Sequence, residues 1–102
     1  MRKQILFLCL LISNISFGQN KGTIYGTVKD KNTEEPLIGA IISANDGKYL
    51  TSADIDGKYS LDLPVGVYNL KATYIGYKEQ IKYNVTLTSG NALSVSFGLS
   101  LD

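Results

Sequence analysis

The chain has 102 residues, with ten basic and nine acidic side chains, one cysteine, no histidine and no tryptophan. A chain of this length forms a single domain with a core of limited size. Its lysines are scattered and never form a run, whereas nucleic-acid binding requires a basic patch and membrane-surface binding a basic amphipathic helix. We therefore expect no nucleic-acid partner and no membrane-surface helix.

The first 18 residues have the pattern of a secretory signal peptide. Arg2 and Lys3 precede eight uncharged apolar residues at positions 5–12, and small residues follow at positions 16 and 18. Eight apolar residues are too few for a bilayer span, which requires about 20. The pattern predicts cleavage before Gln19 and export of residues 19–102 as one domain, with no membrane span in the mature chain.

The predicted mature chain is restricted in its chemistry. Cys9 lies inside the apolar stretch and away from the cleavage point, so we expect no lipid there. Without histidine or cysteine, residues 19–102 lack the side chains of histidine acid–base catalysis, cysteine nucleophiles and the common zinc sites. The adjacent carboxylates Glu34 and Glu35 lie in a polar loop with nothing nearby in sequence to raise their pKa. We therefore expect no enzyme activity, no catalytic residue and no cofactor.

Alternation of apolar and polar residues at a period of two runs through nearly the whole mature chain, without helical periodicity. The first predicted strand covers residues 23–29, where Gly26 on the apolar face leaves room for a neighbouring bulky side chain or for neighbouring backbone. After a polar loop, residues 40–44 and 48–52 predict two short strands. Asp46-Gly47 between them favours a tight hairpin.

Four longer stretches of alternation follow toward the C-terminus. Residues 58–63 and 68–74 each present one apolar and one polar face, and Pro64 ends the first of them. Residues 81–87 and 93–101 alternate in the same way. Their predicted inward side chains are Ile81, Tyr83, Val85, Leu87, Leu93, Val95, Phe97, Leu99 and Leu101. About seven short strands at this spacing predict an all-β, seven-stranded Greek-key β-sandwich.

The segment S-A-D-I-D-G-K-Y-S, residues 52–60, has two interpretations. Two aspartates before a glycine are typical of calcium loops, and Asp54 and Asp56 are weak candidate ligands. With Gly57 at the sixth loop position, the twelfth is Leu63 and the bidentate glutamate is missing. Because the flanking segments alternate as strands, we expect no metal. We expect a hairpin turn in which the Asp side chains cap backbone N–H groups and Gly57 has a positive φ.

Apolar residues that do not fit the predicted core form a candidate interaction surface. They are Tyr25, Ile41, Tyr49, Ile55 and Ile75. Unpaired strand edges offer a second means of protein contact. The alternative interpretation is that these side chains are scattered or covered by loops. Glycan binding is more weakly supported, because two exposed tyrosines without tryptophan make a poor platform for sugars.

Four segments together resemble the carboxypeptidase regulatory-like domain, over residues 22–101. They are G-T-V-K-D, P-L-I-G-A, D-I-D-G-K-Y-S-L-D-L-P-V-G-V-Y-N-L and Y-I-G-Y-K. Each segment alone is a weak signal, whereas their combination and order are specific. The resemblance implies a transthyretin-like, or prealbumin-like, seven-stranded sandwich.

The resemblance also implies a setting in the envelope of Bacteroidetes-type bacteria. Such domains often form the N-terminal periplasmic extension of TonB-dependent outer-membrane receptors, and others accompany metallocarboxypeptidases or surface proteins. We expect a non-enzymatic accessory or interaction module, in the periplasm or at the outer membrane or cell surface. Its partner would be an envelope protein or the rest of a longer receptor chain. The alternative is a stand-alone periplasmic or surface protein that binds glycans or peptides.

The sequence departs from the receptor arrangement in one respect. It ends at Leu101-Asp102, where the last predicted strand ends, with no plug, barrel or peptidase after it. Two explanations remain open: a stand-alone module, or part of a longer gene product.

Overall fold

The computed structural model describes residues 20–102; the predicted signal peptide and Cys9 lie outside this part of the chain. The described residues form strands and no helix, and hence no helix that is long and apolar enough to cross a membrane. The eight strands are β1 (Lys21–Asp30), β2 (Ile41–Ala44), β3 (Tyr49–Ser52), β4 (Lys58–Pro64), β5 (Gly66–Thr73), β6 (Gln80–Leu87), β7 (Ala92–Ser94) and β8 (Phe97–Leu99).

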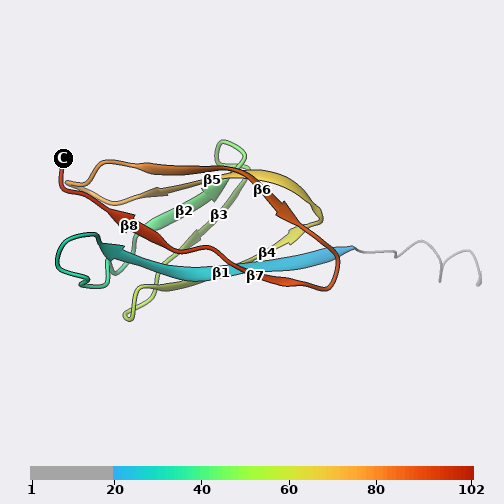
Figure 1. Cartoon of the computed structure of the whole chain (residues 1–102), viewed down its shortest axis with the longest axis horizontal. Helices are drawn as coiled ribbons and strands as arrows, with labels where there is room; N and C mark the ends of the chain where they lie inside the picture. The colour runs from blue at the N-terminus through green and yellow to red at the C-terminus, as the bar shows by residue number, and fades with distance from the viewer. Residues whose placement is uncertain (1–19) are drawn as a thin grey trace, which may run out of the picture.

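The strands form two sheets that stack face to face (Figure 1). In the first sheet β1 lies between β4, which is antiparallel to it, and β7 and β8, which are parallel to it. In the second sheet the order is β3-β2-β5-β6, with every pair antiparallel. The prediction of an all-β sandwich of the prealbumin-like type is confirmed.

One core fills the space between the sheets. Both sheets contribute aliphatic side chains to it. Ile24 and Leu63 of the first sheet and Ile42 and Leu70 of the second are completely buried. Tyr59 and Phe97 pack against each other within it, with ring centroids 6.2 Å apart. Because the buried side chains come from strands throughout residues 24–99, the described part of the chain has a core of its own.

The last predicted strand is divided into β7 and β8 by Val95 and Ser96, which gives eight strands where the sequence predicts seven. At the break the Val95 N–H donates to the Tyr25 carbonyl at 2.8 Å. The Val95 carbonyl accepts a hydrogen bond from the buried Tyr59 hydroxyl. A Cβ at Gly26 would lie 2.7 Å from the Val95 carbonyl carbon, too close for any real contact. The close approach predicted at Gly26 is therefore confirmed.

A β-bulge in β6 reverses the predicted faces of residues 81–83, whereas Val85 and Leu87 face the core as predicted. Val85 pairs with Tyr68 and Lys82 with Leu70, so two residues, Tyr83 and Asn84, lie opposite Asn69. Asn84 accommodates the bulge with a φ of 57°. Residues before the bulge consequently point the opposite way from the prediction.

The inward positions predicted for Ile81 and Tyr83 are therefore wrong. Tyr83 is 66% exposed, and Ile81 lies beside it on the outer face. Lys82, predicted to face solvent, extends over the Phe97 ring and donates to the Ser96 carbonyl at 2.5 Å.

Two further side chains differ from the predicted faces. Tyr49, predicted to point outward, packs partly against the core and lies edge-to-face with Tyr68 at a centroid distance of 6.0 Å. It takes the inward side because it pairs with the buried Ala44 in the β2–β3 hairpin. Leu101, predicted to point inward, is exposed, since the chain by then lies past β8 and forms only an isolated bridge with Tyr77.

Candidate interaction surface

The outer face of the second sheet carries large apolar side chains that solvent reaches. Leu50, Ser43, Lys71 and Ile81 form one row across the four strands, because each is paired with the next. Ile41, Val67 and Tyr83 flank this row on the same face. We call Ile41, Leu50, Val67, Ile81 and Tyr83 the outer apolar face. Leu50 is 60% exposed.

Polar groups are interspersed among these apolar side chains. Asp46, Asn69 and Lys71 join Ile81 and Tyr83 around a shallow hollow. Lys71 lies 3.9 Å from Glu79 in an exposed ion pair. The surface therefore combines apolar contact area with hydrogen-bonding groups, a composition typical of transient protein interfaces.

A second hollow continues this surface toward the β5–β6 loop. Its lining includes Ile41, Thr73, Tyr74 and Ile75, and Ile75 is 90% exposed. The structure thus brings together two predicted interaction residues, Ile41 and Ile75.

The other predicted interaction residues lie elsewhere. Tyr25 is half-exposed on the outer face of the first sheet, and Ile55 is exposed in the β3–β4 turn. Tyr49 belongs to the core side, as described above.

Sequence reasoning missed Leu50, Val67 and Tyr83. The available signal for Leu50 was the hairpin register: if Tyr49 points inward, its neighbour must point outward. The available signal for Tyr83 was Asn84, because asparagine within a strand pattern tolerates the positive φ that a bulge requires.

The first sheet presents a more polar outer face. Tyr25 lies there in a shallow depression with Thr27, Lys58, Ser94 and Ser96. The Ser96 hydroxyl accepts a hydrogen bond from the Thr27 backbone N–H at 3.2 Å. In this depression the exposed Tyr25 ring is flanked by the hydroxyl groups of Thr27, Ser94 and Ser96.

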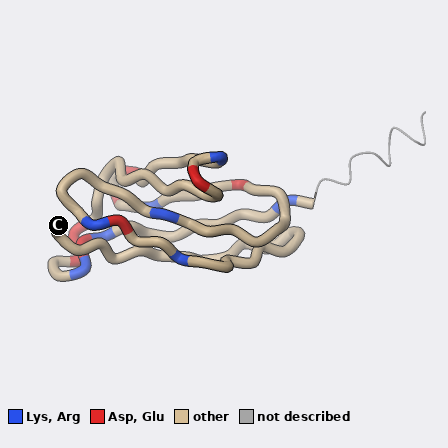
Figure 2. The backbone as a smooth tube through the Cα atoms, turned by 90° about the horizontal axis from the view of Figure 1, so that it is seen from above, with Lys and Arg blue, Asp and Glu red and all other residues tan. Residues whose placement is uncertain are grey.

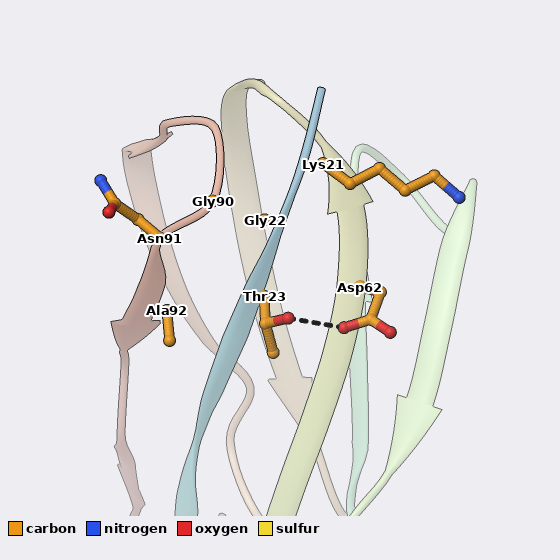
Figure 3. Close-up of a pocket in the computed structure, with 7 residues that line it drawn as sticks. All are labelled: Lys21, Gly22, Thr23, Asp62, Gly90, Asn91 and Ala92. Carbon is orange, nitrogen blue, oxygen red and sulfur yellow. Dashed lines mark hydrogen bonds between the residues drawn. The ribbon is translucent and has the colours of Figure 1, made fainter. Parts of the chain in front are cut away.

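Another depression lies where β1 begins (Figure 3). Thr23 and Asp62 face each other there, and the Thr23 hydroxyl donates to the Asp62 carboxylate at 2.7 Å. The side chain of Asn91 points away from this pair. The hydrogen bond ties β1 to β4 across the first sheet.

The predicted β3–β4 turn is confirmed at Asp54 and Gly57. One Asp54 carboxylate oxygen accepts hydrogen bonds from the backbone N–H groups of Asp56 and Lys58, each at 2.9 Å. Gly57 has a φ of 75°. Within residues 20–102 no three metal-ligating side chains come together, so Asp54 and Asp56 have no third carboxylate beside them.

Asp30 at the end of β1 is buried and hydrogen-bonded on both carboxylate oxygens. The Tyr77 hydroxyl donates to it at 2.6 Å, and the Asn32 and Thr33 backbone N–H groups donate at 2.7 and 3.0 Å. These bonds, the one from Tyr77 above all, lower the pKa of Asp30. The same bond to Asp30 raises the pKa of Tyr77 to about 12. The arrangement fixes the β1–β2 loop against the β5–β6 loop.

Charged residues do not form a patch of one sign. Figure 2 shows lysines and acidic residues distributed along the strands, with both signs mixed at the end of the sandwich that carries the C-terminus. Electrostatics therefore favours no strongly acidic or strongly basic partner.

The two stacked sheets and the single core between them define an all-β sandwich domain. The chain belongs to the CarboxypepD_reg-like domain family, whose model matches residues 24–102. The expected resemblance is thereby confirmed. No curated protein matches the chain in sequence.

Solved structures share the fold at low sequence identity. A chain of the type II cohesin–X-dockerin complex from Acetivibrio cellulolyticus is 18% identical, with a TM-score of 0.62, over 74% of this chain and 52% of that chain. The TIE protein of Bacillus anthracis is 18% identical, with a TM-score of 0.64, over 80% and 17%. The minor pilin of Streptococcus agalactiae is 18% identical, with a TM-score of 0.55, over 81% and 44%. The chain thus spans about half, or less, of the length of these structures.

Proposed function

We propose that the chain is a non-catalytic interaction module of a bacterial cell envelope, exported by its signal peptide. Its setting would be an outer-membrane nutrient-uptake system of the TonB-dependent receptor type, and its partner another envelope protein or the rest of a longer receptor chain. Membership of the CarboxypepD_reg-like family supports this assignment. The observation that carries it is the outer apolar face, whose large side chains lie on rigid strands and remain open to solvent.

The physical argument rests on the cost of exposing apolar surface. Each large side chain left in water forgoes about 1.5–3 kcal/mol of burial free energy, which contact with a partner would recover. Because Ile41, Leu50 and Tyr83 lie on paired strands, little backbone freedom would be lost on binding. The names of the cohesin–dockerin complex and of the minor pilin describe proteins of larger assemblies, which agrees with a modular role.

The experiment is capture of envelope proteins by immobilised residues 20–102, which have a hydrophobic core of their own. Leu50→Ser and Tyr83→Ser alter exposed positions and should reduce capture of a specific envelope protein by about tenfold each, the effect of losing one well-packed anchor. Tyr25→Ser, an exposed tyrosine on the opposite sheet, is the matched control and should leave capture unchanged.

Equal capture by the wild type and both face variants would contradict the proposal. So would the absence of any specific partner in extracts of the native envelope. Circular dichroism of each variant separates a lost contact from a lost fold.

The depression around Tyr25 supports a second candidate function, that of a stand-alone glycan- or peptide-binding protein. An exposed ring flanked by Thr27, Ser94 and Ser96 offers stacking and hydrogen bonding to a sugar. Retention on a glycan array that is lost in Tyr25→Ala and kept in Tyr83→Ser would favour this function over the first.

A further inference from the structure

The sandwich has two lateral edges, where the outermost strands of the two sheets lie next to each other. Within residues 20–102 side-chain hydrogen bonds bridge one of these edges. Figure 1 shows β6 and β8 together on one side and the paler β3 and β4 on the far side. On the first side the Gln80 side-chain oxygen accepts from the Gly98 N–H at 3.2 Å, and Lys82 donates to the Ser96 carbonyl. An inward-pointing lysine and a bulge are devices that block strand addition. The β6 edge has both.

The β4 edge is built differently. On the β4 side of β1, the Val28 N–H donates to the Gly57 carbonyl. On the β7 side, the Thr23 N–H donates to the Asn91 carbonyl and the Tyr25 carbonyl accepts from the Val95 N–H. The backbone groups of successive residues alternate in direction along an antiparallel ladder. The N–H and C=O groups of Tyr59, Leu61 and Leu63 in β4 therefore point toward β1. The N–H and C=O groups of Ser60 and Asp62 therefore point away from the sheet. No hydrogen bond within the described residues uses these four groups.

The free segment of β4 is bounded on both sides. The N–H and C=O of Lys58 already bond with Asp54, and Pro64 has no N–H to donate. The other strand on this side, β3, has only four residues and is a shorter template than the seven-residue β4. An added strand would thus find its longest unblocked edge at β4, centred on Leu61.

We propose that two copies of the chain pair along this edge, with β4 antiparallel to the second copy's β4 and a two-fold axis at Leu61. In this register Ser60 lies opposite the second copy's Asp62, and Asp62 lies opposite the second copy's Ser60. The four free groups of each copy then form four backbone hydrogen bonds between the copies. The two first sheets join into one continuous sheet.

The side chains of β4 are complementary to themselves in this register. The Ser60 hydroxyl lies within reach of the second copy's Asp62 carboxylate, of which one oxygen already accepts from Thr23. Lys58 is diagonal to that same Asp62, so opposite charges approach each other on the outer face. The half-buried Leu61 meets its counterpart on the inner face, at the rim of the core. Hydrogen bonds, charge and apolar contact all favour the same pairing.

The proposal concerns a different sheet from the outer apolar face. The dimer could fail while envelope capture succeeds, or the reverse, because Ser60 and Asp62 lie on β4 and the capture variants lie on β3 and β6. The two proposals are therefore tested by separate substitutions.

The experiment is sedimentation equilibrium of residues 20–102 over a wide range of concentrations, with the variant Ser60→Pro. Proline at this position removes an N–H that points away from β1, so the β1–β4 ladder stays intact while two of the four intermolecular bonds are lost. The matched control is Thr86→Pro on β6. Thr86 is paired with Val67 of β5. The Asn69 carbonyl bonds on the β2 side, so the neighbouring pairs Tyr68–Val85 and Gly66–Leu87 are the hydrogen-bonded ones, and the Thr86 N–H points away from its sheet.

We expect a reversible monomer–dimer equilibrium whose dissociation constant rises by roughly tenfold or more in Ser60→Pro and is unchanged in Thr86→Pro. Asp62→Lys places a like charge near the second copy's Lys58 and should weaken the dimer similarly. It provides the test if Ser60→Pro fails to fold. A chain that stays monomeric up to about 1 mM, or a dimer that neither β4 variant weakens, would overturn the proposal.

Discussion

Gly26 shows how a single missing side chain allows the backbone between β7 and β8 to lie against β1. The Val95 carbonyl lies where a Cβ of residue 26 would be and is held there by the Tyr59 hydroxyl. Burial of that hydroxyl raises the pKa of Tyr59, so it remains a donor at all ordinary pH values. Glycine at this position is required by the close backbone approach.

Gly26→Ala should lower the free energy of unfolding by about 2 kcal/mol, since the new methyl group forces the Val95 backbone to move. Urea denaturation provides the measurement. Gly98→Ala in β8 is the matched control, because its Cβ would meet Lys31 at an ordinary 3.7 Å. The control should change stability by less than about 0.5 kcal/mol. Equal effects at the two glycines would contradict the steric argument.

The Asp30–Tyr77 hydrogen bond should make stability depend on pH at both extremes. The pKa of Asp30 is lowered on folding, so its contribution is present above its unfolded value of 3.8 and is lost as the pH falls through the folded value. The pKa of Tyr77 is raised from 10.0 to about 12, so its contribution is present below pH 10 and is lost as the pH rises toward 12.

Tyr77→Phe should therefore lower the thermal midpoint at neutral pH and flatten its decline in acid and in alkali, as measured by thermal unfolding across the pH range. Tyr83→Phe is the control, since the structure gives the exposed Tyr83 hydroxyl no hydrogen bond within residues 20–102. Parallel pH profiles for wild type and Tyr77→Phe would show that the bond is not linked to folding.

At the scale of single elements, turns and bulges decide which way the strands face. The bulge in β6 turns Ile81 and Tyr83 outward and Lys82 inward, and so supplies two of the five residues of the outer apolar face. The turn before β4 depends on the side chain of Asp54, which bonds two backbone N–H groups. The two aspartates of this turn are not equivalent.

Asp54→Ala should cost about 1 kcal/mol of unfolding free energy, because two backbone donors lose their acceptor. Asp56→Ala, the matched control, should be nearly neutral, since within residues 20–102 the structure shows no hydrogen bond that its carboxylate accepts. Chemical denaturation measures both. We also expect the same thermal midpoint with excess calcium and with a chelator. A calcium-dependent rise that disappears when both aspartates are replaced by asparagine would restore the metal-site interpretation.

At the scale of the whole molecule, β1 connects the two ends of the sequence. Thr23 pairs with Ala92 near the C-terminus and with Asp62 in the middle of the chain. The first sheet can therefore close only when nearly all of the chain is present. Within residues 20–102 the buried core extends from Ile24 to Leu99.

The exported protein should begin at Gln19. Mass spectrometry of the protein recovered from the envelope measures its first residue directly. Cleavage before Gln19 leaves the small residues Ser16 and Gly18 in the removed peptide. Replacing Gly18 with a bulky residue should cause the uncleaved chain to accumulate. A mature protein that retains Cys9 would contradict the prediction.

Much of the fold could be predicted from the sequence, and less of the candidate surface. Alternation correctly places the strands, and the Asp54–Gly57 turn and the close approach at Gly26 follow from local residue chemistry. Of the predicted surface, only Ile41 and Ile75 come together. The rest could not be predicted because alternation defines which residues share a face only until a bulge shifts the phase.

The sequence by itself determined that this chain is an all-β sandwich, since period-two patterning and turn residues are local properties. The combination and order of four motif segments carried its resemblance to the carboxypeptidase regulatory-like family, which the family match confirms. The tertiary structure alone decided that Tyr49 is inside and Tyr83 outside, that β8 continues β7 after a break, and that β4 keeps an open edge. These features depend on pairing between residues far apart in the chain. Such pairing is selected by the packing of the whole core, which no local pattern encodes.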